Sequence, residues 1–230
     1  MSGDRTRPGQ GLTGLFGGTF NPIHLGHLRA AEEAREVLGL ERVIFVPSAD
    51  PPLKRGGARL APARLRLAWV ERAIAGNPGF AVDALELERA GPSYSVDTLR
   101  AFGERLAPDR PVFVIGSDAF AELGLWREPK TLLALAHFAV VTRPPHAAAT
   151  LADAIPAELA AELVLAPGGR EARHRTAGTW LRLVPISALE ISSTDVRRRL
   201  SEGRSVRYLL PEPVLDEILQ SGVYGPGKAR

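Results

Sequence analysis

Short apolar runs alternate with longer helical stripes along this chain, and that alternation limits its fold more than any other feature. A continuous apolar run bounded by turn residues is typical of a strand buried on both faces, as in parallel sheets. The runs that we expect to form strands are residues 12–16, 42–47, 80–87, 111–115, 138–142 and 181–186. Strands separated by helices form right-handed βαβ units. The pattern therefore predicts an α/β fold with a Rossmann-like, doubly wound parallel sheet.

The helical stripes fill the intervals between these runs. The clearest covers residues 24–38, where Leu25, Leu28 and Ala31 recur at helical spacing and Gly39 stands where a C-cap is expected. Further helices are expected at 61–75, 93–106 (with Ser93 or Ser95 as N-cap), 131–136, 151–163, 192–201 and 211–220. The basic stretch between residues 163 and 179 has no regular period, and we expect it to be a loop.

The length of 230 residues suits one domain, and no internal repeat indicates a second. We expect residues 12–230 to form a single α/β domain, with 191–230 as its small C-terminal helical portion. Residues 1–11 are mostly polar and are expected to be a flexible N-terminal leader.

Composition excludes several classes of protein. The chain has no cysteine, which excludes disulfides, thiolate zinc sites and a thiol nucleophile. The net charge is only +3, and the arginines are spread among acidic residues instead of forming the basic face of a nucleic-acid-binding protein. No apolar run reaches the roughly 18–20 residues of a membrane span, and no signal-peptide pattern is present. We expect a cytoplasmic protein that binds neither nucleic acid nor membrane; a homo-oligomer stays open.

The most distinctive polar segment is residues 17–27, Gly-Gly-Thr-Phe-Asn-Pro-Ile-His-Leu-Gly-His, which joins the first expected strand to the first long helix. Glycines let the backbone approach an anion closely, and the free amides of a helix start favour phosphate. His24 and His27 lie three residues apart, so they share a face of the first helical turn and could donate hydrogen bonds to phosphoryl oxygens. Gly26 between them leaves room for a base or a sugar. The segment matches neither a P-loop nor the glycine pattern of dinucleotide folds.

Two other interpretations of the histidine pair stay open at this point. A His-x-x-His pair can bind a metal ion, although no Glu, Asp or Cys stands nearby at ligand spacing. The histidines could also be polar residues that serve only the structure of the helix start.

A second polar segment, residues 191–197, reads Ile-Ser-Ser-Thr-Asp-Val-Arg. Three consecutive hydroxyls exceed what one N-cap needs, so the surplus hydroxyls, the helix amides and Arg197 could bind phosphate. The alternative is a serine capping box followed by a surface arginine.

Both segments come directly after expected strands, as do residues 47–54 and 116–118. Doubly wound sheets bind ligands beyond the carboxyl ends of their strands. These segments are therefore expected to converge on one site.

Together they resemble the (His/Thr)-x-Gly-His nucleotidylyltransferases, and within that superfamily the chain is most similar to the bacterial nicotinate-nucleotide adenylyltransferases. Further segments match that family: Pro-Pro-Leu-Lys at 51–54, Ser-Tyr-Ser-Val-Asp-Thr-Leu at 93–99, Gly-Ser-Asp at 116–118 with Trp126, and Tyr-Leu-Leu-Pro at 208–211. The resemblance runs from residue 12 to residue 220, nearly the whole chain.

The resemblance implies a role for individual residues. Those implied to be catalytic are His24, His27, Lys54 and Arg197. Those implied to bind ATP are Gly17, Gly18, Thr19, Phe20, His24, Gly26, His27, Gly116, Asp118, Ile191, Ser192, Ser193, Thr194 and Arg197. Those implied to bind nicotinate mononucleotide are Thr19, Phe20, Asn21, Lys54, Ser95, Trp126 and Arg127. Mg²⁺ is implied as a cofactor held through the ATP phosphates, with no metal ion held by the protein.

Four positions depart from the family pattern. Leu53 replaces the usual His, which removes one phosphate donor, and Asn21 replaces a common Asp, which removes a negative charge near the phosphates. Arg127 stands where an aromatic residue often follows the Trp. Ser95 replaces Thr and keeps the hydroxyl.

The activity that the resemblance implies is adenylyl transfer from ATP to nicotinate mononucleotide, which gives deamido-NAD and pyrophosphate in NAD biosynthesis. Adenylyl transfer to nicotinamide mononucleotide or to phosphopantetheine is the enzymatic alternative. A protein that senses nucleotides without chemistry is a more remote one. Class I aminoacyl-tRNA synthetases share the His-x-Gly-His motif. This sequence has no Lys-Met-Ser-Lys loop, which argues against that class.

Overall fold

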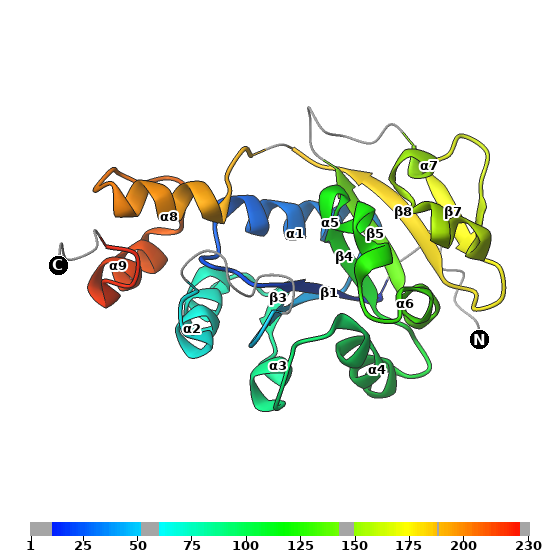
Figure 1. The fold of residues 1–230 in the computed structure, drawn as a ribbon, viewed down its shortest axis with the longest axis horizontal. Helices are drawn as coiled ribbons and strands as arrows, with labels where there is room; N and C mark the ends of the chain where they lie inside the picture. The colour runs from blue at the N-terminus through cyan, green and yellow to red at the C-terminus, as the bar shows by residue number, and fades with distance from the viewer. Residues whose placement is uncertain (1–10, 52–59, 143–149, 188, 226–230) are drawn as a thin grey trace.

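The computed structural model of the protein describes residues 11–51, 60–142, 150–187 and 189–225. Its centre is one eight-stranded sheet in the order β3-β2-β1-β4-β5-β8-β7-β6 (Figure 1). The six parallel strands are β1 (Thr13–Gly18), β2 (Arg42–Pro47), β3 (Phe80–Val82), β4 (Val112–Gly116), β5 (His137–Thr142) and β8 (Trp180–Pro185). The predicted doubly wound parallel sheet is therefore confirmed.

Helices cover both faces of this sheet. The helices of the described residues are α1 (Leu25–Leu38), α2 (Ala63–Ile74), α3 (Leu85–Glu88), α4 (Ser95–Leu106), α5 (Ser117–Ala121), α6 (Pro129–Leu135), α7 (Leu151–Ala154), α8 (Ser193–Ser201) and α9 (Glu212–Ser221), with 3-10 turns η2 (Leu123–Leu125) and η3 (Ala157–Glu162). One core cluster joins α1, α2, α8 and α9 to one face, and a second joins α4, α5, α6 and α7 to the other.

Successive residues of a strand point to opposite faces of the sheet, so each strand contributes side chains to both core clusters. In β5, for example, Phe138 and Val140 belong to one core cluster while Ala139 and Val141 belong to the other. All four are buried. A strand that is apolar on both faces is the signature of a central parallel sheet.

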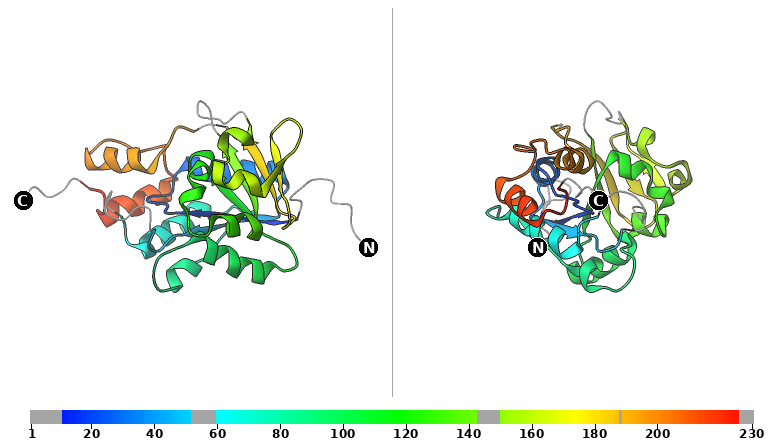
Figure 2. Two further views of the ribbon diagram at one scale, coloured as in Figure 1. Left: turned by 45° about the vertical axis from the view of Figure 1, so that its right-hand side comes forward. Right: turned by 60° about the vertical axis from the view of Figure 1, so that its left-hand side comes forward.

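The C-terminal helices α8 and α9 lie beyond one end of the sheet, next to α1 and α2, and Figure 2 shows the same grouping from two other directions. Val196, Leu200, Val214 and Ile218 of these helices are buried in the core cluster that also contains α1 and β1 residues. The expected leader, residues 1–11, lies almost wholly outside the described residues.

Two expectations about strands were wrong. The strand expected over 80–87 ends at Val82, because the Asp83 carboxylate accepts a hydrogen bond from the Leu85 N–H (2.8 Å) and turns the chain into α3. The stretch expected to be a loop contains two antiparallel strands, β6 (Leu163–Leu165) and β7 (Glu171–His174), which extend the sheet beyond β8. In β7 the buried positions are Ala172 and His174, so only one of its inward side chains is apolar and the run has no apolar pattern.

Two helix expectations also need correction. Neither Ser93 nor Ser95 caps α4: Tyr94 is the N-cap, and it makes no side-chain bond there. The Ser93 hydroxyl instead accepts hydrogen bonds from the Ala49 and Asp50 N–H groups at 3.0 and 3.3 Å. The helix expected over 151–163 is two short pieces, α7 and η3, because Pro156 separates them and lacks the N–H that a continuous helix requires.

Candidate active site

The strand order reverses beside β1, and this reversal locates the site. The strands β2 and β3 lie on one side of β1, and the strands β4, β5 and β8 lie on the other side. Neighbouring strands at such a switch point send their following loops apart, which opens a crevice at the carboxyl edge where ligands bind. Residues 17–27 begin with the last two residues of β1, and residues 116–118 begin with the last residue of β4, so both segments lie at this switch point.

The two histidines of the first segment stack on each other at the start of α1. His24 is the N-cap, and the ring centroids of His24 and His27 lie 3.7 Å apart with planes tilted by 25°. The His24 backbone N–H donates to Nδ1 of His27 at 3.2 Å. Because Nδ1 accepts this bond, the neutral His27 ring carries its proton on Nε2, which can donate to a phosphoryl oxygen. The predicted common face of the pair is confirmed.

Two glycines of this segment make room for its own rings. A Cβ on Gly26 would lie 3.0 Å from Nδ1 of His24, and a Cβ on Gly18 would lie 2.9 Å from the Phe20 ring. We expected Gly26 to leave space for a base or a sugar. The structure gives it a further reason, which is the packing of His24 against the first turn of α1.

Phe20 adopts a backbone conformation that L-residues avoid. Its φ is +46°, and its side chain is buried between Phe16, Phe45 and His27. A non-glycine residue in this left-handed region costs about 1–2 kcal/mol. The strain must be offset by contacts on either side of the residue.

The C-terminal segment supplies contacts on one side. Nη1 of Arg197 donates to the Asn21 carbonyl at 2.7 Å, and the Ser193 hydroxyl donates to the Pro22 carbonyl at 2.9 Å. Nη2 of Arg197 also lies 3.2 Å from the Thr194 hydroxyl. The start of α8 therefore packs directly onto the loop that precedes α1. The expected convergence of the two ends of the chain is confirmed.

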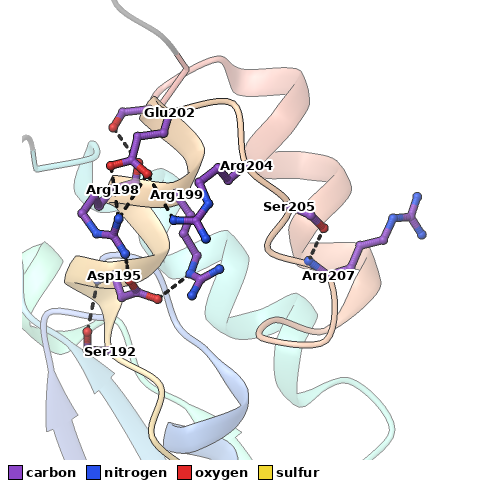
Figure 3. Close-up of polar contacts among 9 residues, drawn as sticks. Ser192, Asp195, Arg198, Arg199, Glu202, Arg204, Ser205 and Arg207 are labelled. Carbon is purple, nitrogen blue, oxygen red and sulfur yellow. Dashed lines mark hydrogen bonds and ion pairs between the residues drawn. The ribbon is translucent and has the colours of Figure 1, made fainter.

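The start of α8 divides its polar groups between capping and the loop (Figure 3). Ser192 is the N-cap, and its hydroxyl accepts from the Asp195 N–H at 3.1 Å, so the capping interpretation holds for this serine. Asp195 pairs with Arg198 and with Arg199, the latter at 2.6 Å. Hydrogen bonds from Arg199 and Arg198 lower the pKa of Asp195. Arg197 is left to face the loop after β1.

Aromatic contacts bring several of the remaining predicted residues together beside β4. The Phe113 ring of β4 lies beside Gly17 and packs edge-on against Trp126, with centroids 6.3 Å apart. The guanidinium of Arg127 lies 4.7 Å over the Tyr94 ring, and Ser95 follows as the first residue of α4. Residues 94–95 and 126–127 therefore lie together on the β4 side.

Gly116 is the last residue of β4, and Asp118 follows it in α5. A Cβ on Gly116 would lie 2.6 Å from an Asp118 carboxylate oxygen, so the glycine lets this carboxylate fold back over the strand end. Ile191 lies just before α8, where its N–H donates to the Leu189 carbonyl at 2.7 Å. Lys54 and Leu53 lie outside the described residues.

Asn21 has a structural role that the sequence did not indicate. Its side-chain oxygen accepts from the Ala61 N–H at 3.0 Å and from the Tyr224 hydroxyl. Burial raises the pKa of Tyr224, so this hydroxyl stays protonated and donates. The amide thus ties the loop after β1 to the start of α2 and to the C-terminal segment. Its predicted contact with nicotinate mononucleotide stays a prediction.

Sequence reasoning missed Arg66. Its side chain is fully buried in α2, on the same helix face as Trp69 and Val70, and donates to the Thr19 carbonyl at 2.6 Å. A charged residue on the apolar stripe of an amphipathic helix is a signal that could have found it.

Within the described residues, no group of three His, Cys, Asp or Glu side chains could hold a metal ion. The His-x-x-His pair therefore has no third ligand there. In the same part of the chain, no helix is long and apolar enough to cross a membrane.

A family model described as cytidylyltransferase-like matches residues 15–199. The match covers well over half of the chain, so the protein belongs to this class of nucleotidyltransferases. Among solved structures, the nicotinic acid mononucleotide adenylyltransferase of Plasmodium falciparum complexed with NaAD superposes with a TM-score of 0.71 at 16% identity, over 94% of this chain and 98% of that one. This likeness supports the fold.

Curated relatives narrow the class. The protein named probable nicotinate-nucleotide adenylyltransferase in Trichlorobacter lovleyi is 45% identical over 93% of this chain and 99% of its own length. Those of Pelobacter propionicus and Geobacter sulfurreducens are 43% and 42% identical over 92% of this chain and 97% of theirs. The chain is thus a member of the nicotinate-nucleotide adenylyltransferase family.

Proposed function

We propose that this protein transfers the adenylyl group of ATP to nicotinate mononucleotide, giving deamido-NAD and pyrophosphate in NAD biosynthesis. The observation that carries the proposal is the packing of the α8 start, with Arg197 and Ser193, onto the loop that holds His24 and His27. The two histidines, Arg197 and the starts of α1 and α8 then lie close together at the switch point of the sheet. This is a site for phosphates, in a chain that belongs to the adenylyltransferase family.

The proposed reaction needs alignment more than it needs a base. The acceptor 5′-phosphate is already an anionic nucleophile, and one of its oxygens forms a bond to the α-phosphorus of ATP. The bond between that phosphorus and the bridging oxygen breaks, and pyrophosphate leaves. Positioning and charge stabilisation are the usual means of catalysis for such in-line transfers.

Several of the predicted residues have a proposed place in this scheme. His24 and His27 face the phosphates, with Nε2 of His27 donating near the α-phosphoryl group. Ser193, Thr194 and Arg197 hold the β- and γ-phosphates, and Gly116 and Asp118 meet the adenosine. Ser95, Trp126 and Arg127 lie on the acceptor side, where the half-buried Trp126 ring could stack on nicotinate. Nε1 of Trp126 is buried and has no hydrogen-bond partner in the described residues, which leaves a donor for a ligand or for water.

Mg²⁺ is proposed to enter with ATP. In this proposal the phosphate oxygens would supply its coordination, and the ion would offset negative charge on the leaving group. A cytoplasmic location stays a prediction, and the oligomeric state stays open.

The test is a comparison of acceptors with the purified protein, ATP and Mg²⁺, followed by pyrophosphate release. We expect release with nicotinate mononucleotide, and we expect mass spectrometry of the product to show deamido-NAD. Release with phosphopantetheine or nicotinamide mononucleotide, but not with nicotinate mononucleotide, would overturn the proposed acceptor. ATP binding without release for any of the three would favour a nucleotide sensor.

A further inference from the structure

Arg66 is a cation enclosed by the protein, and its nearest described acceptors are backbone carbonyls, not carboxylates. Its side chain has no exposed surface, and among the described residues it forms no ion pair. Burial lowers the pKa of Arg66, while Tyr224 and Glu86 raise it, and a guanidinium stays protonated in proteins under ordinary conditions. Removing a charge from water is costly, and well-packed apolar residues often fill a buried space at no greater cost. The arginine therefore calls for an explanation beyond packing.

Three backbone carbonyls accept hydrogen bonds from it, one from each guanidinium nitrogen. Nε donates to Ala61 at 2.9 Å, Nη1 to Thr19 at 2.6 Å, and Nη2 to Ala49 at 3.1 Å. Thr19 follows β1, Ala49 follows β2, and Ala61 precedes α2. One planar guanidinium thus fixes three chain segments relative to one another, which its rigid fork of donors suits and a lysine ammonium does not.

The Thr19 contact leads directly to the candidate active site. The next residue, Phe20, is the one with φ of +46°. Its ring packs edge-on against His27, with centroids 5.2 Å apart and planes at 82°. Arg197 holds the carbonyl on the other side of this strained residue, at Asn21. Arg66 and Arg197 therefore flank Phe20, one from the core and one from α8.

We propose that Arg66 is a positioning residue for adenylyl transfer, which acts by holding the Thr19 carbonyl so that the Phe20 ring fixes the orientation of His27. The proposal rests on the proposed function. It assigns Arg66 no contact with substrate. Its loss should lower kcat more than it raises KM, because the substrates keep their own contacts while the donor of His27 loses its alignment.

Arg110 offers a matched control. Its Nη1 also donates to two backbone carbonyls, at Ala134 (2.9 Å) and Ala177 (2.5 Å), but it precedes β4, at the opposite end of that strand from Gly116. A variant at Arg110 removes carbonyl contacts of the same kind far from the switch point. Comparing the Arg110 and Arg66 variants therefore distinguishes a general loss of protein stability from a loss of the alignment of His27.

The experiment measures kcat, KM for both substrates and the thermal midpoint for the parent, R66M, R66K and R110M, at a temperature where each is folded. We expect R66M to lose about 30- to 100-fold in kcat with each KM within about threefold. R66K should fall between R66M and the parent, and R110M should keep kcat within about twofold while its midpoint falls. A folded R66M with parental kcat, or an equal loss of kcat in R110M, would overturn the proposal. If R66M does not fold, R66K carries the same comparison.

A second readout does not depend on activity. Long-range ¹H–¹⁵N spectra of the histidine rings report which nitrogen carries the proton. We expect His27 to show one Nε2–H tautomer in the parent and in R110M, and a mixture of ring states in R66M. An unchanged His27 signal in R66M would contradict the positioning role of Arg66, whether or not the parent is active. A parent without adenylyl transfer would overturn the proposed function alone.

Discussion

At the scale of single residues, the site depends on how one ring is oriented. His27 is held by a backbone N–H on Nδ1, by the stacked His24 ring and by the Phe20 edge. A side chain constrained on three sides presents its remaining nitrogen in one direction. Preorganisation of this kind lets a donor stabilise charge without reorganising during the reaction.

We therefore expect His27→Ala to lower kcat by about two to three orders of magnitude, the usual effect of losing one such donor. The ring is half-buried at the crevice and not in the core, so the thermal midpoint should change little. Steady-state kinetics and a thermal melt of the same preparation check both statements. Near-parental turnover in a folded H27A would remove His27 from the catalytic residues.

A different histidine should control stability toward acid. Burial, with the nearby charge of Arg110 next, lowers the pKa of His137 to about 4. Its ring stacks on Trp180 at 4.6 Å, and its Nδ1 accepts the Trp180 N–H at 3.1 Å. Between pH 6.5 and 4 the unfolded chain binds a proton that the folded chain refuses, so the free energy of unfolding falls as the pH falls through this window. The loss amounts to at most about 3 kcal/mol.

Urea unfolding at several pH values between 7 and 4 tests this expectation, with His137→Asn as the comparison. Asn can accept the Trp180 N–H without titrating, so H137N should be less stable at pH 7 but should lose less stability on acidification. Parallel pH profiles for the two proteins would show that another group is responsible.

At the scale of elements, a single hydroxyl supports the helix that carries Arg197. Ser192 caps α8 by accepting the Asp195 N–H, and substitution of such a cap costs about 1 kcal/mol. We expect Ser192→Ala to lower the free energy of unfolding by that amount. Ser205 is the control, since its hydroxyl accepts from the nearby Arg207 N–H (3.3 Å) outside any helix (Figure 3). Equal stability changes in S192A and S205A would contradict the capping role.

The elements also show what the sequence could predict. The bounds of β2 were predicted to the residue, because the apolar run from Val43 to Pro47 follows the charged Glu41 and Arg42 and precedes the polar Ser48. The strands β6 and β7 were missed because both are short and β7 is polar on one face. Their antiparallel pairing with each other and with β8 determines them more than local pattern does. Long-range pairing of this kind is not visible in a short window of sequence.

At the scale of the whole molecule, the site is made from segments far apart in the chain. Arg197 donates to the carbonyl of Asn21, and Tyr224 donates to its side chain, so the last helices hold the first loop. The sequence identified the two end segments and their convergence. It did not identify Arg66 or Tyr224, because neither belongs to a polar motif and each acts from inside the core.

The most direct test of this account is the rate of pyrophosphate release from ATP and nicotinate mononucleotide by Arg197→Met. If the C-terminal segment forms half of the ATP site, a folded R197M should release pyrophosphate at least about 100-fold more slowly than the parent, which itself should release it only when the acceptor is present. Parental release by a folded R197M would contradict the claim that the two ends of the chain build one active site.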